Sequence, residues 1–222
     1  MGGMIPLGDA SRRPGKAATI TVLLIVANVL VFVLELGGGE PFLHHWSAIP
    51  ARLMHGHHPI TLVTAMFMHA GWMHIIGNMV FLWAFGPAME DAMGSLRFLL
   101  FYLGGGLVAM VAQVASDPHS AIPVLGASGA IAAVMGAFLV TFPRDRIRTL
   151  LFFLIFFRVT YIPAVLLIGF WFLIQLWNLG AVTEVRSGGV ANLAHVAGFL
   201  FGVALGRLLA DPQRLAYRNL YG

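Results

Sequence analysis

The chain has 222 residues, of which 59% are hydrophobic and 10% are charged, and its formal net charge is +4. A soluble domain is about half apolar and about a quarter charged, so this composition excludes an ordinary soluble domain and indicates a membrane protein. The absence of cysteine excludes a disulfide scaffold and a cysteine-ligated metal. We expect no nucleic-acid partner.

Six apolar runs bounded by proline, glycine and charge predict an all-α membrane protein with six transmembrane helices. The first run is about 20 residues long, which suits a full span and exceeds the apolar core of a signal peptide. The expected helices are 17–36, 61–86, 95–115, 125–142, one within 150–179, and 190–209. We therefore expect a cytoplasmic segment 1–16, a core 17–209 and a cytoplasmic tail 210–222.

The stretch 147–179 is too long for one perpendicular helix across a core of about 30 Å. Arg158 and Pro163 interrupt it. We expect an interfacial piece before the fifth helix.

The basic residues lie mostly on one side of this six-helix arrangement. Only Arg52 and Arg186 fall on the opposite side, and Arg158 is ambiguous. The positive-inside rule therefore predicts that both termini are cytoplasmic. The residues on the cytoplasmic side are Arg12, Arg13, Lys16, Arg97, Arg144, Arg146, Arg148, Arg207, Arg214 and Arg218.

The segment 37–60 is expected to be a long external loop. Its histidines show no helix-like ligand spacing, so a metal site there is the less favoured interpretation. A loop of this length is usually functional or packed by its own side chains. The histidines are His44, His45, His55, His57 and His58.

A few polar side chains lie inside the apolar runs, where each is a functional candidate because burial in the bilayer is costly. Asn28 and Gln113 could simply bond across helices. The stronger candidates are His69, His74 and Asn78 on the second helix, Ser128 on the fourth and His195 on the sixth.

These candidates are expected at similar depths. Counting about 1.5 Å per residue from the cytoplasmic ends places Ser128 about 21 Å up, and His74 and His195 about 18 Å up. Gly198, Gly202 and Gly206 form a small-residue stripe on the face of His195, and Ser128, Ala132 and Gly136 form a matching stripe. If the stripes face each other, Ser128 meets His195.

A serine hydroxyl needs a base to become a nucleophile, and histidine is the commonest base. We expect a Ser128–His195 dyad without a carboxylate, because the acidic residues considered fall in loops or at helix ends. Those residues are Glu90, Asp91, Asp117, Asp145 and Glu184.

Acyl transfer also needs hydrogen-bond donors for the developing oxyanion. His74 and Asn78 are four residues apart and share a helix face. The string from Gly126 to Gly129 adds backbone N–H groups where the fourth helix begins, at the positive end of its dipole. Gly129 also leaves room for a peptide to approach.

Three motifs in order resemble the rhomboid intramembrane protease family over roughly 20–207. Gly126-Ala127-Ser128-Gly129 resembles its nucleophile motif, and Ala194-His195-Val196-Ala197-Gly198 its base motif. His74-Ile75-Ile76-Gly77-Asn78 resembles its oxyanion pattern, with His69 matching a further histidine. Glu90, Gly94 and Phe98 resemble the start of its third helix.

The resemblance implies a six-helix core, a cavity open to the outside, and cleavage of transmembrane substrates near their outer end, with no cofactor. Supporting roles fall to His69, Gly129 and Gly198. Ala132 stands where some members have a tyrosine against the base histidine, so the group that orients His195 is not identified. Ile60-Thr61 stands where many members have Trp-Arg.

Three other functions fit the sequence less well. An inactive rhomboid-like protein that binds membrane clients would lack the serine or the histidine, and both are present. A proton or metal transporter built on the histidines would be expected to show an internal repeat, and the sequence shows none. A zinc protease is disfavoured because the sequence has no His-Glu-xx-His string. Compact size favours a bacterial plasma membrane.

Overall fold

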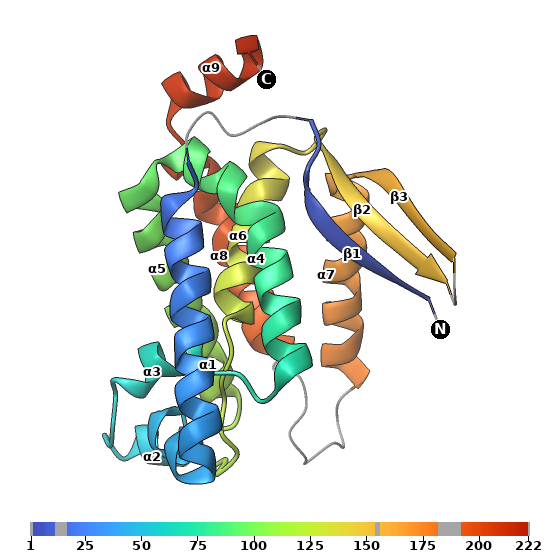
Figure 1. Ribbon diagram of the computed structural model, residues 1–222. Coiled ribbons are helices and arrows are strands. Elements are labelled where there is room, and N and C mark those ends of the chain that lie inside the picture. The colour runs from blue at the N-terminus through green and yellow to red at the C-terminus, as the bar shows by residue number, and fades with distance from the viewer. Residues whose placement is uncertain (1, 12–16, 154–155, 182–191, 222) are drawn as a thin grey trace.

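The computed structural model describes residues 2–11, 17–153, 156–181 and 192–221. The chain is mainly helical, with one small sheet beside the helices (Figure 1). In chain order the elements are β1 (Gly2–Asp9), α1 (Thr19–Trp46), α2 (Pro50–Met54), α3 (Thr61–Thr64), η1 (Ala65–Phe67), α4 (Trp72–Met93), α5 (Ser95–Ser116), α6 (Ser128–Thr141), β2 (Arg146–Phe153), β3 (Phe156–Pro163), α7 (Ala164–Ala181), α8 (Asn192–Leu209) and α9 (Pro212–Tyr221).

Helix α6 is the centre of the helical bundle. It packs against α8, α5 and α4, and every residue from Gly129 to Phe138 is buried. The outer helices turn large apolar side chains outward instead: Leu30 on α1 and Leu173 on α7 are 60% and 62% exposed. An apolar exterior suits contact with lipid, so the chain is a multi-pass integral membrane protein.

Three helices among the described residues are long and apolar enough to cross a membrane: α1, α5 and α8. A fourth span results if α3–η1 and α4 are counted together, since they meet at a bend of 90°. Helices α6 and α7 are apolar but shorter.

The first two helices differ from the prediction. Helix α1 runs on to Trp46 across a kink at Gly39, whose φ of 57° favours glycine, so residues 37–46 are not a plain loop. The predicted helix 61–86 is broken at 68–71, and α4 continues past Pro87 to Met93. His74 therefore lies in the first turn of α4. Its expected depth was counted from residue 86 as the helix end, whereas the helix continues to Met93.

The expectation of an all-α chain is wrong for the residues before α7. The segment 146–162 is rich in β-branched and aromatic residues, which favour strands, and it forms the antiparallel pair β2 and β3. Ile147 and Thr149 are buried while Arg146 and Arg148 are exposed, the period of a strand. Strand β3 ends at Pro163, and α7 begins with Ala164.

The N-terminal segment is also part of this sheet. Strand β1 pairs antiparallel with β2, from Gly2 opposite Phe153 to Asp9 opposite Ile147, with a bulge between Pro6 and Gly8. The strand order is β1-β2-β3, so β2 is central. Residues 2–9 are therefore fixed to the segment that follows α6.

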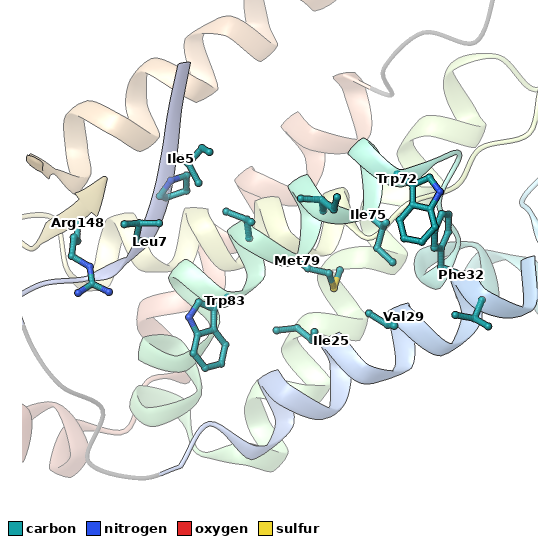
Figure 2. A pocket seen from close by; sticks show the side chains of 14 residues that line it. Ile5, Leu7, Ile25, Val29, Phe32, Trp72, Ile75, Met79, Trp83 and Arg148 are labelled. Atoms are coloured by element: carbon teal, nitrogen blue, oxygen red, sulfur yellow. The ribbon is translucent and has the colours of Figure 1, made fainter. Parts of the chain in front are cut away.

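Strand β1 and helices α1 and α4 enclose an apolar pocket of about 880 Å³, seen in Figure 2. Trp72 and Trp83 line it from α4, and Arg148 of β2 adds the one charged side chain among its lining residues. Neither Ser128 nor His195 belongs to that lining. The candidate site is therefore separate from this pocket.

A buried carboxylate fixes the ends of three helices relative to one another. Glu90 accepts hydrogen bonds from the backbone N–H groups of Ile20 and Thr21, at 2.9 and 2.8 Å, where α1 begins. It also accepts a hydrogen bond from the hydroxyl of Ser95, at 2.9 Å, where α5 begins. A carboxylate at helix N-termini satisfies donors that have no helical partner, so this end of the bundle is well defined.

Candidate active site

Helices α6 and α8 are in backbone contact through their glycines. A Cβ atom added at Gly198 would overlap the carbonyl oxygen of Gly129, and one added at Gly202 would overlap that of Ala133. A Cβ at Gly136 would in turn overlap the carbonyl oxygen of Phe199. Helices α6 and α8 meet through small residues, as predicted. The residues of α6 opposite Gly198, Gly202 and Gly206 are Gly129, Ala133 and Ala137, one position after the predicted stripe of Ser128, Ala132 and Gly136.

Ser128 is the first residue of α6, with Ala127 at the N-cap. Its side chain is half-buried. The first N–H groups of a helix lack helical partners and carry the positive end of its dipole, so this position favours a negatively charged oxygen. A small cavity of about 10 Å³ lies beside Ser128, lined also by Gly126 and Ala194. It has room for about one water molecule.

His195 is buried in the first turns of α8, and its ring is held by α7. Its Nδ1 lies 2.8 Å from Oε1 of Gln175. The ring of Trp171 lies 5.7 Å from the imidazole, centroid to centroid. Gln175 was not predicted as a site residue, although a lone amide within an apolar helix was a usable signal. Trp171 provides the aromatic contact that Ala132 cannot.

The backbone contact brings the turns that carry Ser128 and His195 together. A Cβ added at Gly129 would lie 3.8 Å from the Cβ of Ala194, so the two neighbouring residues meet. The hydrogen bonds among the described residues do not include one between Ser128 and His195. Catalytic hydrogen bonds are often long in the free enzyme and tighten when substrate binds.

His74 and Ser128 both lie close to Gly126. A Cβ at Gly126 would lie 3.0 Å from Nε2 of His74 and 3.7 Å from Oγ of Ser128. The Nδ1 atom of His74 accepts the N–H of Ala70 at 3.3 Å. Because Nδ1 is an acceptor, the neutral ring carries its proton on Nε2, the atom that faces Gly126.

The predicted role of Gly126 as an oxyanion donor is wrong. Its N–H donates to the carbonyl oxygen of Ala65 at 2.8 Å, so this group is already engaged. Gly126 contributes space instead: its φ is +128°, and a side chain there would meet the ring of His74.

Asn78 lies one turn after His74 on α4 and is 8% exposed. Its Nδ2 has no hydrogen-bond partner within the described part of the chain. An unpartnered buried amide is unfavourable, and in an active site it provides a donor that is ready for substrate.

The expectation that no carboxylate lies near this layer is wrong. Glu35 of α1 is buried, and its Oε2 accepts the N–H of His69 at 3.0 Å. His69 lies in the break between η1 and α4, with its ring 5.1 Å from that of His74. Glu35 thus holds the turn that precedes His74, and it does not contact His195.

The histidines of the 44–58 segment are not gathered into a site. His45 and His58 have ring centroids 5.4 Å apart, and His44 lies 3.5 Å from Glu40. Across the described ranges, no group of three His, Asp or Glu side chains is arranged to hold a metal ion.

Comparison with known proteins shows the family of the chain. A Rhomboid domain matches residues 56–212, which covers α4 to α8. The chain belongs to the rhomboid family. This rhomboid is 36% identical over 125 residues to the rhomboid protease GluP of Bacillus subtilis, covering 54% of the chain and 24% of that relative.

Other relatives come from bacteria and plants. The putative rhomboid protease YdcA of Bacillus subtilis is 37% identical over 78 residues, 35% of this chain and 39% of its own length. The mitochondrial RHOMBOID-like protein 6 of Arabidopsis thaliana is 32% identical over 169 residues, 73% of this chain and 48% of its own length. This rhomboid thus spans less than half of each relative named.

Proposed function

We propose that this rhomboid is an intramembrane serine endopeptidase that cleaves transmembrane segments of other membrane proteins near their outer end. The observation that carries the proposal is the backbone contact between α6 and α8, which brings the turns of Ser128 and His195 together. The buried amides and imidazoles around Ser128 suit acyl transfer. No cofactor or metal takes part in the proposed reaction.

In this mechanism, Oγ of Ser128 attacks the carbonyl carbon of the substrate peptide bond. Nε2 of His195 accepts the hydroxyl proton and later gives it to the departing amine, which breaks the C–N bond. Water then attacks the acyl-enzyme, again with His195 as base, and releases the second product.

Three groups of donors surround the position of the oxyanion. They are Nε2–H of His74, the free Nδ2–H of Asn78 and the N–H groups of the first turn of α6. All are fixed before substrate arrives, which makes their stabilisation of the transition state effective. His69, Gly129 and Gly198 support the site by packing.

The proposed topology has six spans: α1, α3–η1 with α4, α5, α6, α7 and α8. Both termini then lie in the cytoplasm, with the segment 1–16 before the core 17–209 and the tail 210–222 after it. The asymmetry of arginine and lysine supports this orientation. Relatives in Bacillus subtilis support a bacterial plasma membrane, although other relatives are mitochondrial.

The test uses purified protein in liposomes with a model single-span substrate. Wild type should cleave the substrate and react with an electrophilic serine probe, and Ser128→Ala should do neither while remaining folded. Binding of the substrate without cleavage by wild type would favour the inactive client-binding protein. Labelling that persists in Ser128→Ala would show that another residue is the nucleophile.

A further inference from the structure

The side chain of Gln175 points away from lipid. It is 7% exposed, whereas its neighbours Ile174 and Leu176 are 40% and 41% exposed and Trp177 is 78% exposed. A polar side chain buried in the bundle needs hydrogen-bond partners, because lipid offers none. Gln175 finds two of them, one on its own helix and one on α8.

The orientation of the Gln175 amide is determined by its own helix. Nε2 donates to the carbonyl oxygen of Trp171 at 3.3 Å, one turn earlier. Exchanging the two ends of the amide would set its oxygen against that carbonyl oxygen, which is unfavourable. Oε1 is therefore the atom directed at Nδ1 of His195, at 2.8 Å.

A carbonyl oxygen only accepts hydrogen bonds, so Nδ1 of His195 must be the donor. A neutral imidazole with its proton on Nδ1 has its lone pair on Nε2. This is the form that can take a proton from a serine. It is also the reverse of His74, whose Nδ1 accepts an N–H and whose Nε2 keeps the proton.

We propose that Gln175 is a positioning residue that holds His195 in the Nδ1–H tautomer, so that Nε2 is free to act as the base for Ser128. The proposal rests on the protease function proposed above. When His195 takes up the serine proton, its Nδ1–H bond to Gln175 becomes charge-assisted and stronger. A neutral amide does this without the cost of a second buried charge in the bundle.

The direct test is ¹⁵N NMR on histidine-labelled protein in lipid, with the His195 signals assigned by their loss in His195→Ala. In neutral wild type, Nδ1 should be protonated and Nε2 unprotonated. In Gln175→Leu, the signals should move toward a mixture of tautomers. A wild-type His195 with its proton on Nε2 overturns the proposal, and this reading does not require any variant to fold.

The second test measures the rate at which a serine probe labels Ser128. Gln175→Leu should lower the rate by about 10- to 100-fold, as for the loss of one catalytic hydrogen bond. Gln175→Glu keeps the acceptor and should recover much of the rate. If Gln175 were merely structural, Gln175→Glu would label more slowly than Gln175→Leu, since a buried carboxylate packs worse than leucine. That order overturns the proposal.

Gln113→Leu is the matched control. Oε1 of Gln113 also bonds to α8, at the N–H of Ala194, 3.2 Å away, but it does not touch the imidazole. Its loss should leave the His195 tautomer unchanged. If Gln113→Leu shifts the tautomer as much as Gln175→Leu does, general loosening of α8 is the cause and the proposal fails. A correct tautomer in a wild type that cleaves nothing would overturn the protease function and leave the role of Gln175 intact.

Discussion

His74 lies near Ser128 at Gly126, and Asn78 lies one turn later on α4. His74→Ala and Asn78→Ala should each lower kcat by about 100-fold for the loss of a principal oxyanion donor, with KM nearly unchanged. The kinetics of a model substrate in liposomes would measure this.

Asn28→Ala is a suitable control for those two variants. Asn28 is fully buried, and its Nδ2 bonds to the carbonyl oxygen of Leu24 within α1, away from the serine. Its loss should affect thermal stability more than kcat. Equal losses of kcat in all three variants would contradict an oxyanion role for His74 and Asn78.

The proposed chemistry uses only protein groups. EDTA should therefore leave the cleavage rate unchanged, measured with and without chelator on the same substrate. Loss of activity that zinc restores would instead point to a metal held by the histidines of 44–58 or of α4.

The polar residues of the site could be predicted because they interrupt apolar helices. Ser128, His195, His74 and Asn78 stand out on that ground alone. Glu35 and Gln175 also interrupt apolar helices, but their roles could not be predicted because their partners are distant in sequence: the N–H of His69 lies 34 residues from Glu35, and His195 lies 20 residues from Gln175. No spacing rule connects such pairs.

At the scale of helices, the contact between α6 and α8 predicts the effect of replacing its glycines by alanine. Gly198→Ala or Gly202→Ala would push a methyl group into a backbone carbonyl oxygen, and the helices would have to separate. We expect a loss of about 1–3 kcal/mol in stability, as for other overpacked cores, together with loss of cleavage. Thermal unfolding and substrate cleavage would measure the two effects.

Gly169→Ala on α7 is the control, because a Cβ there meets nothing within 4 Å. Replacing a helical glycine by alanine in open space stabilises a helix by about 0.5–1 kcal/mol. If Gly198→Ala were equally harmless, α6 and α8 would not be in backbone contact.

The sequence predicted some elements closely and others not at all. The predicted helix 95–115 corresponds to α5, Ser95–Ser116, because Gly94 and Asp117 mark its ends. The segment of β2 and β3 was expected to be an interfacial piece before the fifth helix, and its strands were not predicted, since apolar content alone does not separate a buried strand from a helix. Its pairing with β1 is a contact between segments far apart in the chain, which local patterns do not report.

For the whole molecule, the proposed function implies that the position of Ser128 determines which end of a substrate is cut. A transmembrane helix hides its peptide bonds in its own hydrogen bonds, so it must unwind before Ser128 can attack. Glycine, proline and polar residues lower the cost of unwinding. Replacing such residues by leucine near the outer end of the substrate should slow cleavage without changing membrane insertion.

Mass spectrometry of the products would locate the cut. Cleavage at the cytoplasmic end of the substrate would show that the proposed orientation is wrong. Leucine substitutions that leave the rate unchanged would show that unwinding does not limit the reaction.

The strand order has a consequence for biogenesis. Strand β1 is synthesised before its partner β2, which emerges from the ribosome only after α1 to α6 have been made. The hairpin of β2 and β3 can close locally, whereas β1 must wait for a partner more than a hundred residues downstream. A nascent chain stopped after α6 would thus carry β1 without a partner strand.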